Sequence, residues 1–314
     1  MRKTFGSEKP NQSRTKTHLN EIITAKIVRM DKFIEKVFEL TMGHSAERAV
    51  RMGSIIFAIV GFFLHLTLWV LHTTGKLIIV GDTSELVRSP LSTLYTPFSI
   101  LLIYEVYQLI RAIPESFSSS IGKQYEVATL LVVRDLFKRL ADLEASAGWK
   151  VGEDLGFFLI ESVTFLALFY TSLSFYRQKS IGTKFEGIVA DAKIFIGTKR
   201  LVANLMLIVF VMTAGHAFWE WVVEVQSGGG SVSSTIFFLD FFTFLILADI
   251  LILLISYWSY TDFGSLARNT GFVLSTVIIR VAISFEGVSA MILFTLSSIL
   301  GIAIIKMFTP SKAV

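Results

Sequence analysis

The apolar residues of this chain fall into long blocks, and these blocks constrain its fold more than any other feature. A helix needs about 20 predominantly apolar residues to cross the ~30 Å hydrocarbon core of a bilayer, and blocks of that order recur along the sequence. The composition agrees, because 53% of the 314 residues are hydrophobic and only 17% are charged, whereas soluble domains carry about 25% charged residues. The sequence predicts an all-α, polytopic integral membrane helix bundle.

Six full spans and one short helix are expected. The spans cover residues 53–74, 94–113, 155–176, 201–225, 235–258 and 288–308. A further apolar stretch at residues 272–284 is interrupted by Phe285-Glu286-Gly287 before the last span begins. The interrupted stretch is interpreted as a re-entrant, interfacial or tilted helix, so seven spans is the alternative count.

The chain begins with two basic segments that precede the transmembrane domain, residues 46–314. Residues 1–17 are interpreted as a flexible basic tail, and residues 18–45 as an amphipathic basic helix. The part at residues 18–42 either lies on anionic lipids of the bilayer surface or packs on the protein's own bundle. A second amphipathic helix is predicted at residues 125–143, and its short apolar run places it outside the membrane on the cytoplasmic side.

The distribution of Lys and Arg predicts a cytoplasmic N-terminus, because basic residues concentrate on the cytoplasmic side of membrane proteins. Strict alternation of six spans then puts residues 177–200 outside, although this segment carries six basic residues, Arg177, Lys179, Lys184, Lys193, Lys199 and Arg200. The conflict has two explanations. Either this connector is an exception to the rule, or the number of crossings between residues 125 and 200 is wrong.

Several ionisable side chains fall inside predicted spans, where a charge costs about 2.5–3.5 kcal/mol at the helix centre on insertion scales. Such residues usually face the bundle interior or a water-filled path. The candidates for transport or gating are Glu105, Glu161, Asp249, Arg280 and His65. Asp249 and Arg280 have opposite signs, and we expect them to form an intramembrane ion pair that acts as a helix clamp or as a gate.

A weaker candidate lies in the fourth span, where His216, Glu220 and Glu224 follow one another at intervals of four residues. Side chains four apart share one face of a helix, as a metal or proton site requires. They also approach the end of the span, where carboxylates commonly meet water. No metal and no cofactor are therefore assigned.

The motifs that the sequence lacks argue against several classes of function. It contains no cysteine, no TVGYG filter, and none of the phosphate-binding, dinucleotide-binding, GxSxG or HExxH motifs, so enzyme activity is not expected. We expect an ion or proton channel, or a transporter-like protein with a polar intramembrane interior. The alternative is a non-transporting sensor or scaffold that recruits a partner through its basic amphipathic helices. A homo-oligomer is also expected, and nucleic acid is not an expected partner.

Overall fold

The structure is a computed structural model that describes residues 26, 29–76, 89–145, 153–179, 189–227, 234–259, 263–285 and 287–308. Within these ranges the secondary structure is helical and contains no strand. The labelled helices, in chain order, are α2 (His44–Thr73), η2 (Pro90–Leu94), α3 (Tyr95–Ala112), α4 (Phe117–Ala145), α5 (Glu153–Lys179), α6 (Val189–Ser227), α7 (Ser234–Ser259), α8 (Phe263–Ile283) and α9 (Val288–Phe308).

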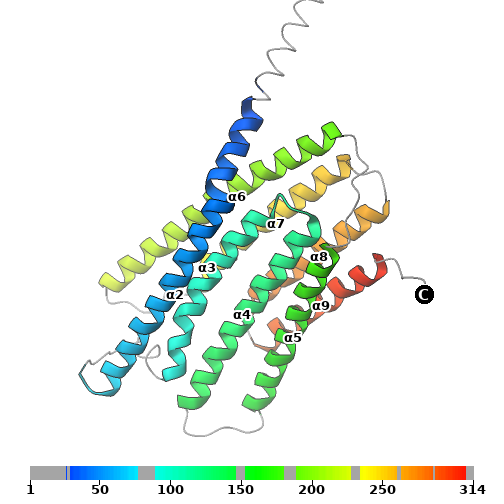
Figure 1. Ribbon diagram of the computed structural model, residues 1–314. Helices are drawn as coiled ribbons and strands as arrows, with labels where there is room; N and C mark the ends of the chain where they lie inside the picture. The colour runs from blue at the N-terminus through cyan, green and yellow to red at the C-terminus, as the bar shows by residue number, and fades with distance from the viewer. Residues whose placement is uncertain are drawn as a thin grey trace, which may run out of the picture.

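The helices form two layers of four, and each layer follows the order of the chain. In the first layer α2 packs on α3, α3 on α4, and α4 on α5; in the second, α6 packs on α7, α7 on α8, and α8 on α9. The layers meet where α3 contacts α6, α4 contacts α8, and α5 contacts α9. Successive helices run in alternating directions, and the two layers cross at an angle (Figure 1).

Helix α4 is shared by two hydrophobic cores. On one side Val127 and Leu131 pack with residues of α3, α6 and α7. On the other side Ile121, Tyr125 and Ala128 pack with residues of α5, α8 and α9. Both faces of α4 are therefore occupied by neighbouring helices.

In the part of the chain that the structure describes, five helices are long and apolar enough to cross a membrane, which gives the protein the character of a helical membrane protein. They are Arg29–Thr73, Leu155–Gln178, Phe195–His216, Phe263–Ile283 and Val288–Phe308. The described apolar part of α7, Thr243–Ile255, is shorter. Helices also cover the other predicted spans at residues 94–113 and 235–258, as α3 and α7.

The helix expected at residues 272–284 is longer than predicted. It begins at Phe263 and has 21 residues, because the polar Arg268 and Asn269 are accommodated within α8 instead of ending it. Gly287 follows with a φ of +68°, a left-handed conformation that glycine adopts without steric cost. Gly287 directly precedes α9, so the interruption seen in the sequence separates two helices of 21 residues each.

The structure places the predicted extramembrane helix, residues 125–143, inside the bundle. It is part of α4, which has 29 residues and packs along α5, one of the five membrane-crossing candidates. The prediction outside the membrane rested on its short apolar run. Two of its charged side chains, Glu126 and Arg139, are paired with Tyr176 and Glu161 of α5.

The described part of the basic amphipathic helix, residues 29–42, continues into α2 after a break at Gly43. It lies against α6, since Arg200 donates a 2.6 Å hydrogen bond to Glu35 and the Asn204 amide donates to the Ile34 carbonyl. Ile34 and Met42 are buried. One side of residues 29–42 therefore packs on the bundle, whereas Met30, Phe33 and Leu40 are exposed.

Candidate functional site

Three charged side-chain clusters lie along α4, and the first joins α4 to α7 and α8. Arg280 Nη2 donates to Asp249 Oδ2 at 2.7 Å and to Gln124 Oε1 at 2.7 Å. Gln124 Nε2 in turn donates to Asp249 Oδ2 at 2.9 Å. The predicted ion pair between Asp249 and Arg280 is therefore present, and an amide of α4 closes it into a triad.

This triad is buried and lies where the two helix layers meet. The side chains of Arg280 and Asp249 are only 3% and 8% exposed, and Gln124 is buried as well. Breaking a buried pair by removing one partner costs about 3–5 kcal/mol, because the remaining charge stays uncompensated. Arg280 lies near the end of α8 and not at its centre as the sequence suggested; its depth comes from the crossing of the layers.

A second cation lies near the triad. Lys199 of α6 is buried, its Nζ donates a 2.8 Å hydrogen bond to the Glu115 carbonyl, and it interacts electrostatically with Asp249. Nη1 of Arg280 is also buried and makes no hydrogen bond to any group that the structure describes. Two cations and one carboxylate therefore meet in this cluster, with one donor left over.

The second cluster connects α3, α4 and α5. Lys123 Nζ lies 3.0 Å from Glu105 Oε2 and 2.9 Å from Glu126 Oε2. The Tyr176 hydroxyl donates to Glu126 Oε2 at 2.6 Å. Glu105 is thus one member of a chain of four ionisable side chains, all partly accessible to solvent.

The third cluster connects α4 to α5. Arg139 Nε contacts both Oε1 and Oε2 of Glu161 at 3.1 Å, and its guanidinium lies 3.8 Å from the centre of the Phe157 ring. The Glu161 side chain is 3% exposed. Because Arg139 and the ring cover it, Glu161 is a bound partner in this structure and not an open carboxylate.

Four of the five predicted transport or gating candidates, Glu105, Glu161, Asp249 and Arg280, are consequently distributed over three separate clusters. Each cluster contains a side chain of α4, namely Gln124, Lys123 or Arg139, and the sequence prediction included none of these. Their partners lie far away in the sequence, so a single sequence does not show that they meet.

His65 is separate from all three clusters. It is buried on α2, and its Nδ1 lies 2.7 Å from Thr96 Oγ1 of α3. Gly61, one turn earlier, faces the same threonine, since a Cβ there would lie 3.0 Å from Thr96 Cγ2. His65 therefore links α2 to α3 at a point of close helix contact.

The histidine and carboxylates of the fourth predicted span do not form a metal site among the described side chains. His216 Nδ1 and Glu220 Oε1 are 3.7 Å apart, and both side chains are more than half exposed. The Glu224 side chain lies outside the described residues. No group of three metal-ligating side chains occurs in the described part of the chain.

Close packing around Tyr125 joins α4, α8 and α9. The Tyr125 hydroxyl donates to the Ser297 carbonyl at 2.7 Å, and Ser297 Oγ donates to the Ser275 carbonyl at 2.6 Å. A Cβ on Gly301 would lie 2.6 Å from the Tyr125 oxygen. The small residues Ser297 and Gly301 of the last span thus serve contacts within this chain.

Comparisons of the chain with protein-family models, curated proteins and solved structures found no match. The class of the protein follows from its architecture alone: a multi-pass helical protein of membrane type with charged clusters buried between its helices.

Proposed function

We propose that the protein transports ions across the membrane, and that the Gln124–Asp249–Arg280 triad is its gate. The observation that carries this proposal is a buried ion pair at the contact between two helix layers. Asp249 and Arg280 both belong to the second layer, so a movement that separates the layers here must break the hydrogen bonds that join Gln124 of α4 to each of them. Because Arg280 then loses an acceptor in a buried region, an arriving ion that replaces this acceptor can control the movement.

The charges of the triad region favour an anion as the transported species. Lys199 interacts electrostatically with Asp249, and Arg280 Nη1 has no hydrogen-bond acceptor among the described residues. A buried donor without a partner is the kind of group that binds a water or a ligand. A small anion at Arg280 would satisfy this donor and balance the local charge.

Flux into liposomes tests the proposal. The purified full-length chain is reconstituted, and the fluxes of chloride and of protons are measured against those of empty vesicles. We expect an anion flux that Arg280→Gln lowers about tenfold or more, because the variant removes the charge that attracts the ion. Glu161→Gln is the matched control, since it changes a buried ion pair of α4 and α5 outside the triad.

Two results would count against transport by this route. An equal loss of flux in Arg280→Gln and Glu161→Gln would mean that general stability, and not the triad, is responsible. Absence of any flux from folded protein would favour the second candidate function, a sensor or scaffold.

The sensor or scaffold alternative rests on residues 29–42. In this segment Met30, Phe33 and Leu40 are exposed beside basic residues, and this surface would bind anionic lipid or a partner protein. Helix α4 no longer supports it, because both of its apolar faces are covered.

We further propose that all eight helices from α2 to α9 cross the membrane, with both termini in the cytoplasm. Adding α4 as a crossing moves the basic segment at residues 177–200 to the cytoplasmic side, together with the N-terminal tail. The connectors at residues 228–233 and 284–287 then lie outside, and neither contains Lys or Arg. This arrangement removes the conflict with the positive-inside rule that six spans create.

A further inference from the structure

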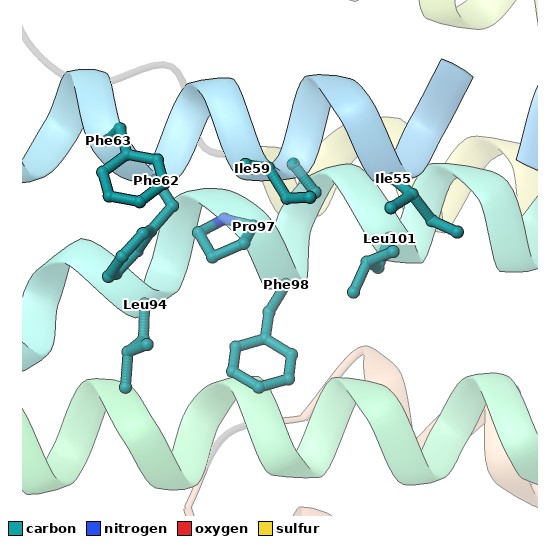
Figure 2. Close-up of a pocket in the computed structure, with 9 residues that line it drawn as sticks. Ile55, Ile59, Phe62, Phe63, Leu94, Pro97, Phe98 and Leu101 are labelled. Carbon is teal, nitrogen blue, oxygen red and sulfur yellow. The ribbon is translucent and has the colours of Figure 1, made fainter. Parts of the chain in front are cut away.

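An apolar groove lies between α2 and the start of α3. It holds about 400 Å³ of open space, and only apolar side chains line it. Ile55, Ile59 and Phe62 of α2 form one wall, and Leu94, Pro97 and Leu101 of η2 and α3 form the other (Figure 2). Phe98 also lines the groove and stacks on Phe137 of α4, with ring centres 4.9 Å apart, which closes the space between α3 and α4.

The groove opens beside a surface suited to hydrocarbon. Ile56, Phe57, Val60 and Leu64 of α2 are all strongly exposed, and α2 belongs to one of the helices apolar enough to cross a membrane. An exposed apolar surface of this extent is stable only against lipid or another apolar partner. The groove is therefore continuous with the lipid-facing side of α2.

Two arginines extend the line of groove residues toward the N-terminus of α2. Arg51 and Arg48 precede Ile55 by four and seven residues, so all three lie on one side of the helix. Both arginines are exposed. Arg51 Nε lies 3.9 Å from Glu47 Oε1, a long contact, and the same oxygen accepts hydrogen bonds from Tyr104 and Gln108. The positive charge at this end of the groove is thus only weakly compensated.

We propose that this groove is a specific site for an anionic phospholipid. One acyl chain occupies the space between α2 and α3, and the phosphate of the head group binds Arg48 and Arg51. A concave apolar site with a few polar groups at one end is the general form of a site for an amphipathic ligand. The guanidinium groups suit a phosphate because they offer several donors in a planar fork.

Retention of lipid by the detergent-solubilised full-length protein tests the proposal. The protein is exposed to phosphatidylglycerol and phosphatidylcholine with identical acyl chains, and the bound lipid is measured by native mass spectrometry. We expect phosphatidylglycerol to be retained in preference. Each of Arg48→Gln and Arg51→Gln should reduce this preference about fivefold, as expected for roughly 1 kcal/mol per basic residue at an anionic lipid surface.

Variants that fill the groove test the acyl-chain part separately. Ile59→Trp and Leu101→Trp should both lower the retention of phosphatidylglycerol. Ile56→Trp should not, because Ile56 is on the same helix and exposed but does not line the groove. Lys306→Gln is the matched control for charge, since it removes an exposed basic residue at the end of α9.

All variants are first shown to be folded by their elution volume and circular dichroism. Three outcomes would then overturn the proposal in whole or in part. Equal retention of the two lipids by the wild-type protein would overturn the role of Arg48 and Arg51. Unchanged retention in both tryptophan variants of the groove would overturn the assignment of the chain. If Ile56→Trp and Ile59→Trp lower the retention of phosphatidylglycerol equally, the effect is a general one of changes on α2. This result would also overturn the assignment of the acyl chain.

Discussion

Arg280 is buried where a lone charge is poorly tolerated, and two partners compensate for this. Asp249 balances the charge, and Gln124 accepts a further hydrogen bond. The sequence allowed the prediction of the pair, because opposite charges in two apolar segments compensate each other. It did not allow the prediction of Gln124, since an uncharged amide in a polar stretch carries no such signal.

Removing one member of the pair should be more damaging than removing both. We expect Arg280→Met to lower the thermal unfolding temperature strongly, in line with about 3–5 kcal/mol for a broken buried pair. The double variant Arg280→Met/Asp249→Leu should recover much of this loss, because it leaves no buried charge without its partner. Thermal unfolding in detergent measures both. A double variant less stable than Arg280→Met would contradict the buried pair.

The contact at Gly301 predicts a second, steric effect. Gly301→Ala should destabilise the protein, because the new Cβ would lie 2.6 Å from the Tyr125 hydroxyl oxygen. Tyr125→Phe removes that oxygen, so Gly301→Ala/Tyr125→Phe should be more stable than the sum of the two single changes predicts. A strictly additive double variant would show that the two groups are not in contact.

At the scale of single helices, α2, α5, α6 and α9 could be predicted because their apolar runs are long enough to be recognised without any partner. Part of α4 was predicted as a helix, at residues 125–143, but its position inside the bundle could not be predicted. Its polar residues are paired with Glu105, Glu161 and Asp249 on other helices, and a single sequence does not show which distant residues meet. For the same reason α8 was expected to begin later than it does, since Arg268 and Asn269 resembled a loop.

The contact of residues 29–42 with α6 can be tested because the natural chain lacks cysteine. Glu35→Cys/Arg200→Cys should be joined rapidly by a short bifunctional thiol reagent, since the native side chains are 2.6 Å apart. Lys32→Cys/Arg200→Cys is a control one turn away. Equal cross-linking of the two pairs, or none in the first, would mean that this helix does not stay on α6 and would restore the surface-bound alternative.

At the scale of the whole molecule, the two hydrophobic cores share α4 and therefore do not form separate halves. The number of crossings depends on the same helix, since counting α4 and α8 together gives eight crossings and counting neither gives six. Six and eight crossings agree on the side of the termini and differ on the connectors around α5. Those connectors distinguish the two topologies.

Single cysteines in these connectors decide the topology. With eight crossings, Ser146→Cys, between α4 and α5, reacts with a membrane-impermeant maleimide added outside intact cells, and Thr183→Cys, between α5 and α6, does not. With six crossings the two results exchange. Permeabilised cells supply the control, in which both cysteines should react.

Because the chain is synthesised from its N-terminus, α4 is made before most of the helices that it contacts. When α4 leaves the ribosome, Glu105 is already available for Lys123, but the partners of Gln124 and Arg139 on α5, α7 and α8 have not yet been made. In the proposed topology of eight crossings, the stable placement of α4 therefore depends on helices that are synthesised after it.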